Sequence, residues 1–326
     1  MISIAITIRH DRSVSLPDKS RAKVVTMGNV IEVTAMDKTS RGAPVRKLDK
    51  DRFVDGRTGE VREYQHAETR ADNVASVRRS LASVRALVNC NVTNPKNCLW
   101  VTLTYAENMT DSGRLYADYD RFWKRFKYYC KSHDISVPEY INVVEPQGRG
   151  AWHCHVFLCW SSPAPFLPND DVIAPLWGHG WTKTKAIKDC DNVGAYFSAY
   201  LGDMPLDEVD RLPDDLREAA MGVSGEINDK TFEDDRGTEK KKAFVKGARL
   251  VLYPAGMNIC RTSRGVKRPL EEIMTLKMAR KKASSGKLTF ASSFELSGDD
   301  GVCLNRIIKE QYNMVRGKAQ AGKKGD

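Results

Sequence analysis

The segment from Glu145 to His155, EPQGRGAWHCH, carries the residues best suited to chemistry. Side chains alternate between the two faces of a strand, so His153 and His155 are expected on one face and Cys154 on the other. The Gly-rich turn predicts a hairpin that brings Glu145 alongside both histidines. Two imidazoles and one carboxylate leave coordination positions open, as a catalytic divalent ion requires. The alternative is an ordinary half-buried strand with one hydrogen-bonded and one solvated histidine.

A second candidate is the segment Gly194–Leu201, GAYFSAYL. Tyr196 and Tyr200 are four residues apart, so both hydroxyls project from one face of a helix. A phenol can attack phosphorus when a nearby metal ion polarises the phosphate, and two phenols would allow one to cut a strand and the other to rejoin it. The alternative is an aromatic stripe that packs the helix onto a sheet.

Short elements surround these residues. We predict strands at Cys98–Tyr105, Glu139–Glu145, Trp152–Trp160 and Trp181–Ile187, and helices at Thr69–Leu87, Asp118–Lys131, Asp170–Leu176 and Asn192–Leu201. The order β-α-β-β-α-β-α over residues 98–203 favours an α+β fold with a central antiparallel sheet. We expect helices on one face of this sheet and the metal site on the other.

The flanking regions differ in character. β-prone runs at Ile2–Ile8 and Lys23–Ala35 lie in an N-terminal region, residues 1–68, whose role the sequence leaves open. After the core, residues 69–203, comes an acidic segment, residues 204–245, in which Ser224–Lys242 is expected to be a mobile loop. The basic C-terminal region, residues 246–326, is expected to contain a strand at Arg249–Tyr253, a helix at Arg268–Lys282 and a disordered tail at Gly317–Asp326.

Charge favours a polyanionic partner. The formal net charge is +10, and residues 246–326 contain 17 basic and 7 acidic residues, against 7 basic and 12 acidic residues in 204–245. Nucleic acid is the leading candidate. No apolar stretch is long enough for a membrane span or a signal peptide, and the eight cysteines form no CxxC pair. These features predict a reduced, intracellular protein.

Together the motifs resemble those of the HUH endonucleases, and in particular the rolling-circle replication initiators of small phages and plasmids. The similar pieces occur in order: the TLTY strand at Thr102–Tyr105, the two-histidine strand, LWGHGW at Leu176–Trp181 and the tyrosine helix. A basic segment at Thr262–Pro269, TSRGVKRP, is also similar. The specific resemblance covers about residues 70–203, and it implies a ferredoxin-like core with N-terminal β-rich and C-terminal basic extensions.

The resemblance implies that His153 and His155 bind a metal ion with Glu145 as the third ligand, and that Tyr196 and Tyr200 are nucleophiles. Mg²⁺ or Mn²⁺ is the expected cofactor. Many relatives place a bulky apolar residue where Cys154 stands. Many also carry a lysine next to the second tyrosine, where this sequence has Ala199 and Leu201. The order in which the two tyrosines act therefore stays open.

The implied activity is nicking of single-stranded DNA at an origin through a 5′-phosphotyrosine, which leaves a 3′-hydroxyl primer, followed by strand rejoining. GxxxxGK[ST] is absent from the sequence, so we expect no nucleotide cofactor, a separate helicase and a host DNA polymerase. No membrane partner is expected, and a phage or plasmid protein would act in the bacterial cytoplasm.

DNA contacts are expected from basic side chains at three places: the hairpin turn, the helix at Asp118–Lys131 and the C-terminal basic segment. The candidates are Arg149, Lys124, Lys127, Lys131, Arg264, Lys267 and Arg268. A solvated outer face is the alternative explanation for the lysines. Trp152 and Trp177 would either stack unpaired bases or pack against the sheet.

Three other functions fit parts of the pattern. A relaxase or transposase of the same superfamily would share the chemistry and differ in the DNA that it cuts. A non-catalytic nucleic-acid-binding regulator would bind without forming a covalent adduct. A zinc-dependent hydrolase would use the histidines and need neither tyrosine.

Overall fold

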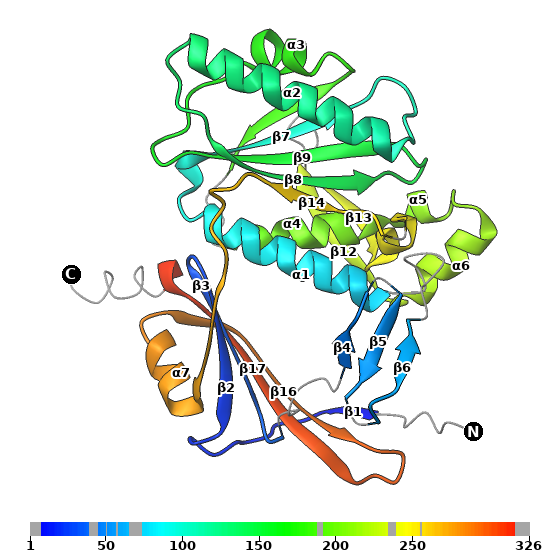
Figure 1. Cartoon of the computed structure of the whole chain (residues 1–326), viewed down its shortest axis with the longest axis vertical. Helices are drawn as coiled ribbons and strands as arrows, with labels where there is room; N and C mark the ends of the chain where they lie inside the picture. Colours follow the sequence, from blue (N-terminus) through cyan, green and yellow to red (C-terminus); the bar gives the residue numbers. More distant parts are fainter. Residues whose placement is uncertain are drawn as a thin grey trace. The chain divides into compact units, whose positions relative to one another are not determined.

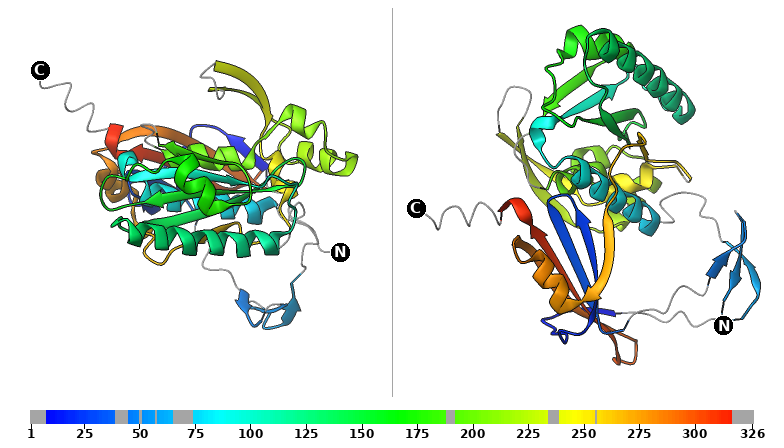
Figure 2. Two further views of the ribbon diagram at one scale, coloured as in Figure 1. Left: turned by 90° about the horizontal axis from the view of Figure 1, so that it is seen from above. Right: turned by 60° about the vertical axis from the view of Figure 1, so that its left-hand side comes forward.

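The computed structural model describes residues 8–38, 45–49, 51–56, 58–64, 74–187, 192–233, 239–254 and 256–316 (Figures 1 and 2). The chain divides into two compact units, one formed by Met1–His66 with Pro269–Asp326 and the other by Ala67–Arg268. The two ends of the chain thus contribute to one unit. Residues 204–268 belong to the same unit as the histidine strand.

The unit Ala67–Arg268 is built on a five-stranded antiparallel sheet with strand order β10-β7-β9-β8-β14. The strands are β7 (Cys98–Thr104), β8 (Glu139–Pro146), β9 (Trp152–Cys159), β10 (Thr182–Ala186) and β14 (Cys260–Thr262). Its helices are α1 (Val74–Asn91), α2 (Ser112–Ser132), α3 (Ala174–Trp177) and α4 (Val193–Gly202), with a π-helical turn at Asn169–Ile173 and a 3-10 turn at Pro95–Asn97. The predicted α+β class with a central antiparallel sheet is confirmed.

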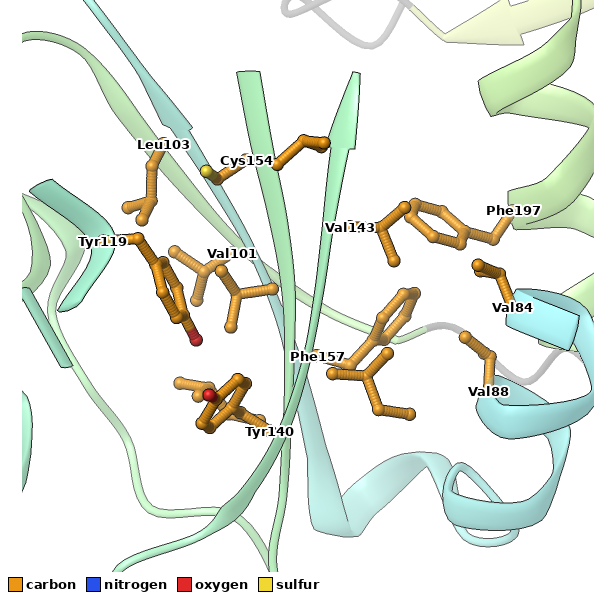
Figure 3. Close-up of a cluster of buried hydrophobic side chains, with 14 of the residues drawn as sticks. Val84, Val88, Val101, Leu103, Tyr119, Tyr140, Val143, Cys154, Phe157 and Phe197 are labelled. Atoms are coloured by element: carbon orange, nitrogen blue, oxygen red, sulfur yellow. The ribbon is translucent and has the colours of Figure 1, made fainter. Parts of the chain in front are cut away.

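Helices cover both faces of this sheet, so the expectation of helices on one face was wrong. Figure 3 shows Tyr119 of α2 beside Val101 and Leu103 on one face, and Phe197 of α4 beside Phe157 on the other. The physical reason lies in β8 and β9, which are buried along nearly their whole length. Strands that are apolar on both faces need a packed layer on each side.

Residues 204–254 form a small subdomain within this unit. Its elements are β11 (Met204–Pro205), α5 (Leu206–Val209), α6 (Asp214–Gly222), β12 (Ile227–Glu233), β13 (Glu239–Val245) and a 3-10 helix, Ala248–Leu252. Where a loop was expected over Ser224–Lys242, β12 and β13 pair as antiparallel strands, because backbone pairing does not need apolar periodicity. The strand predicted at Arg249–Tyr253 was also wrong: Gly247, with φ of 74°, turns the chain into the 3-10 helix.

The other unit contains a six-stranded antiparallel sheet with order β1-β16-β17-β3-β2-β15. Its strands are β1 (Ile8–Asp11), β2 (Arg21–Met27), β3 (Val30–Met36), β15 (Leu270–Thr275), β16 (Lys287–Ser297) and β17 (Cys303–Asn313). A separate three-stranded sheet contains β4 (Val45–Lys47), β5 (Arg52–Asp55) and β6 (Val61–Glu63).

The helix expected over Arg268–Lys282 is shorter, because β15 pairs with β2 before α7 (Leu276–Ala283) begins. The core of this unit joins Leu276 and Ala279 of α7 to Val24 and Val33 of the sheet. Most of the predicted Ile2–Ile8 strand and the predicted tail at Gly317–Asp326 lie outside the described residues. Among the described helices of both units, none has the length and apolar character needed to cross a bilayer.

The LWGHGW segment holds β10 against β7. Trp177 is fully buried and donates from Nε1 to the carbonyl oxygen of Thr104 at 2.9 Å. Gly180 has φ of 152°, and a Cβ atom there would lie 2.3 Å from the backbone nitrogen of Ala106. Only glycine permits this close approach. The segment therefore fixes the edge strand beside the strand that pairs with the two histidines.

A close contact between α1 and α4 positions the tyrosine helix. Asn89 of α1 accepts a hydrogen bond from the backbone N–H of Gly194 at 2.8 Å and donates to Asn192, the N-cap of α4, at 3.0 Å. A Cβ atom on Gly194 would lie 2.3 Å from the carbonyl oxygen of Arg85. The two helices thus meet backbone to backbone.

We expect Gly194→Ala to destabilise the protein by about 1–3 kcal/mol, because the added methyl group must push α4 away from α1. Urea unfolding of the full chain measures this loss. Gly222→Ala is the matched control, because a Cβ atom there meets nothing within 4 Å. Equal stability of the two variants would contradict this account of the α1–α4 contact.

Candidate metal and tyrosine site

The hairpin of β8 and β9 brings the predicted triad together. Glu145 lies directly opposite His153 in the register, and Val143 opposite His155, so all three side chains share one sheet face. The Nε2 atom of His155 lies 2.5 Å from Oε2 of Glu145. One potential ligand atom from each residue lies within 4.8 Å of the others. The group Glu145, His153 and His155, hereafter the triad, could hold a metal ion.

The donor atoms of the triad fit a divalent cation. The Nε2 atom of His153 is buried and has no hydrogen-bond partner, which is unusual for a buried polar atom. Burial lowers the pKa of His153 to about 4, so the imidazole is neutral at pH 7. A neutral imidazole with a free nitrogen is the form that binds metal ions. Nε2 of His155 and Oε2 of Glu145 share one proton in their hydrogen bond, and a cation bound by the triad would replace that proton.

A buried arginine supports Glu145. Arg249, only 7% exposed, forms an ion pair in which its Nη1 lies 2.9 Å from Oε1 of Glu145, and the same Nη1 donates to the carbonyl oxygen of Pro146 at 3.0 Å. Its Nε donates to the carbonyl oxygen of Asp203, the C-cap of α4, at 3.3 Å. Burial alone would raise the pKa of Glu145, but Arg249 and His155 outweigh it and lower that pKa. Arg249 therefore keeps Glu145 ionised and links its strand to the tyrosine helix.

Arg249→Met should weaken Mn²⁺ binding to the full chain by about 10- to 100-fold, the range found when partners of metal ligands are removed. Arg249→Lys should restore part of the affinity, because it keeps the charge but loses the forked geometry. Isothermal titration with Mn²⁺ measures the effect. Arg280→Met is the control, since Arg280 pairs with another buried carboxylate, Glu310, at 2.5 Å in the other unit. Unchanged affinity of Arg249→Met would contradict a supporting role.

The two tyrosines differ in their relation to the triad. Both project from α4, with Tyr196 62% and Tyr200 43% exposed, while Phe197 between them is buried. The ring of Tyr200 stands edge-on to His155 with centroids 5.3 Å apart. The ring of Tyr196 reaches Trp100 instead, at 6.3 Å. Tyr200 is therefore the tyrosine that lies against a candidate metal ligand.

The negative charge of Glu145, together with burial, raises the pKa of Tyr200. The phenol of Tyr200 is thus protonated at neutral pH, and a cation held by the triad would offset the repulsion from Glu145. A tyrosine that becomes a better nucleophile only when a cation is present suits metal-dependent chemistry.

The expected DNA-binding residues occupy three separate places. Arg149 is exposed in the β8–β9 turn, where it lines a pocket with Gln147 and Arg211. The lysines of α2 are exposed on the helix that covers the opposite sheet face, so the structure does not bring them to the triad; they are Lys124, Lys127 and Lys131.

The C-terminal basic segment lies at the other end of β8 from the triad. Its Gly265 donates a backbone hydrogen bond to Glu139, at the start of the strand. Glu139 and Glu145 are six residues apart, or about 20 Å along a strand. Arg264, Lys267 and Arg268 are exposed there.

The structure decides between the two alternatives given above for Trp152 and Trp177, and it adds Thr102 and Arg249 to the residues of the site. Trp152 and Trp177 are buried and donate from Nε1 to carbonyl oxygens, which confirms packing rather than base stacking. Thr102, on the strand beside β9, has its hydroxyl 3.3 Å from Nδ1 of His155. Arg249 was assigned to a strand, although a lone arginine in the apolar run ARLVLY was a signal of a buried, paired charge.

Comparison with known proteins supports a replication initiator protein. The model of the replication-associated protein ORF2 family matches residues 98–204. This stretch runs from β7 to the end of α4 and contains the triad and both tyrosines. No curated protein and no solved structure shows a significant match to the chain. The match supports a role in replication initiation.

Proposed function

We propose that this chain is a metal-dependent, site-specific nickase of single-stranded DNA that initiates rolling-circle replication and later rejoins the strand. The observation that carries the proposal is the edge-on contact between Tyr200 and His155 at the triad. It lies within the stretch that matches the replication-associated family. A phenol beside a cluster of metal-ligating atoms is the arrangement needed to transfer a phosphoryl group to tyrosine.

Glu145, His153 and His155 would hold Mg²⁺ or Mn²⁺, which when bound supplies positive charge that polarises the scissile phosphate. The hydroxyl oxygen of Tyr200 forms a bond to phosphorus while the bond from phosphorus to the 3′ oxygen breaks. The proton of the phenol is balanced by the proton that the 3′ oxygen gains. The products are a 5′-phosphotyrosine and a free 3′-hydroxyl, and the reverse reaction rejoins the strand.

We assign the first cleavage to Tyr200 and the second phosphoryl transfer to Tyr196. Tyr196 is one helical turn away on the same face and is more exposed, so it can receive a second strand end while Tyr200 carries the first. Arg149, exposed in the turn beside the triad, would contact the substrate backbone. Arg264, Lys267 and Arg268 would contact DNA about 20 Å along the sheet.

The proposal includes partners. The substrate would be a single-stranded origin, opened by a separate helicase and extended from the 3′-hydroxyl by a host polymerase. If a phage or plasmid encodes the chain, these events take place in the bacterial cytoplasm.

The test uses a pool of 5′-labelled and 3′-labelled, partly degenerate single-stranded DNA with Mn²⁺ or EDTA. Label on the 3′ side of the cut should remain with the protein on a denaturing gel only when Mn²⁺ is present. Mass spectrometry of the digested adduct should find a nucleotide phosphate on Tyr200. DNA from the element that encodes the chain replaces the pool if the pool gives no adduct.

Three outcomes would count against the proposal. Binding without an adduct on either DNA would indicate a non-catalytic regulator. Cleavage that releases both ends and persists without both tyrosines would indicate a hydrolase. An adduct formed equally well in EDTA would exclude the role given to the triad.

A further inference from the structure

The edge strand β10 and Trp181, the residue before it, place two lysines and an aromatic ring on the face of the sheet that carries the triad. Lys183 lies opposite Thr102 in the register, and Thr102 lies opposite His155. The backbone N–H of Thr104 donates to the carbonyl oxygen of Trp181 at 2.9 Å, and Thr104 lies opposite His153. Cross-strand neighbours share a face. Trp181, Lys183 and Lys185, hereafter the edge-strand surface, therefore lie in line with the triad.

Trp181 differs from the other tryptophans. All six lie in the described part of the chain, and Trp181 alone is exposed, with 57% of its surface accessible. Nζ of Lys183 lies 5.7 Å from the centroid of its ring. An exposed indole beside lysines combines the two features by which proteins hold unpaired nucleotides, base stacking and phosphate neutralisation.

Two polar atoms without a hydrogen-bond partner lie on the same face, between the triad and β10. The hydroxyl of Thr104 is buried without a hydrogen-bond partner, as is Nε2 of His153 opposite it. Neighbouring strands lie about 4.8 Å apart, so β10 is about 10 Å from the histidine strand. A nucleotide close to the scissile phosphate would therefore reach the edge-strand surface.

We infer that the edge-strand surface binds the nucleotides that flank the scissile phosphate of single-stranded DNA. One base stacks on Trp181, and Lys183 and Lys185 neutralise neighbouring phosphates. The inference rests on the proposed function for the identity of the substrate. It places the DNA on the triad's face of the sheet, away from the lysines of α2. A duplex would not be held in this way, because its bases are not free to stack on the indole.

The test measures binding of a fluorescent oligo(dT) strand to the full chain by anisotropy, in EDTA and over a range of salt concentrations. Trp181→Ala should weaken binding by about 5- to 150-fold, the cost of losing one base–aromatic stack. Lys183→Gln with Lys185→Gln should lower the slope of log K against log salt by about 1.4, or about 0.7 for each phosphate that is no longer neutralised. Thermal melting checks that each variant folds.

The matched controls come from α2, which also carries an exposed aromatic residue and lysines. Tyr128 is 75% exposed, and Lys127 and Lys131 flank it. Tyr128→Ala and the double variant Lys127→Gln with Lys131→Gln should leave both the affinity and the salt slope unchanged. Losses in the α2 variants that equal or exceed those in the edge-strand variants would overturn the inference.

This measurement is independent of cleavage. Weaker binding in the edge-strand variants would support the surface even if wild-type protein formed no covalent adduct, in which case the proposed nickase activity alone would fail. Unchanged oligo(dT) binding in Trp181→Ala, together with a normal adduct in the wild type, would overturn the surface and leave the nickase standing.

Discussion

Tyr200→Phe should reduce formation of the covalent protein–DNA adduct by at least about 1000-fold, whereas Tyr196→Phe should leave the first cleavage nearly unchanged. The reason is position: the ring of Tyr200 contacts His155 of the triad, and the ring of Tyr196 contacts Trp100. Phenylalanine keeps these ring contacts and removes only the hydroxyl oxygen, so folding should be preserved. Adduct formation in Mn²⁺, followed over time on denaturing gels, gives both rates.

The same pair of variants separates cutting from rejoining. Tyr196→Phe should accumulate adduct and fail to cleave a second strand, because no second phenol is left to attack it, so no new 3′ end forms to accept the first strand. The reverse ranking, in which Tyr196→Phe abolishes the first cleavage, would contradict the assignment. Undiminished adduct in the double variant would require a nucleophile other than these tyrosines.

His153→Ala should weaken Mn²⁺ binding by more than about 100-fold. This loss exceeds the range seen when only a supporting partner of a metal ligand is removed. It should leave the stability of the metal-free protein unchanged or slightly higher, because Nε2 of His153 is buried without a hydrogen-bond partner. The measurement is thermal melting with and without Mn²⁺. At 100 times the dissociation constant, the ion should stabilise the wild type by about 2.7 kcal/mol.

The variant should lose this Mn²⁺-dependent stabilisation. His133→Ala is the matched control, because His133 caps α2 and contacts Tyr129, away from the triad. Its response to Mn²⁺ should equal that of the wild type. If His153→Ala kept the full metal response, the ion would be bound elsewhere or by Glu145 and His155 alone. A strong loss of stability in the metal-free variant would instead indicate a structural role for His153.

The local elements of the core followed closely from the sequence. The alternation HCH, the turn PQGRG and the apolar runs around them predicted the hairpin, and the structure has Glu145 opposite His153 as expected. Turn residues and the alternation of side chains along a strand involve only residues that are close in sequence, so the sequence alone predicts them. The α4 helix was equally clear, because its N-cap Asn192 and its apolar residues lie within one short segment.

Elements without apolar periodicity were missed. The β12–β13 hairpin contains a dense run of charged residues, and its pairing comes from backbone hydrogen bonds that no side-chain pattern records. The pairing of β3 with β17 joins segments that are distant in sequence. Such long-range pairing is decided by which surfaces remain to be covered, and that depends on the rest of the fold.

The sequence by itself determined the kinds of reactive group and their local spacing: two imidazoles on one strand face, a carboxylate across a turn and two phenols one helical turn apart. Only the tertiary structure decided which phenol meets the triad, that Arg249 supports Glu145 and that Trp181, rather than Trp152 or Trp177, faces solvent. Spacing within an element is set by covalent geometry and backbone hydrogen bonds. Contacts between elements are set by packing, in which a backbone approach such as that of Gly194 to Arg85 fixes where a whole helix lies.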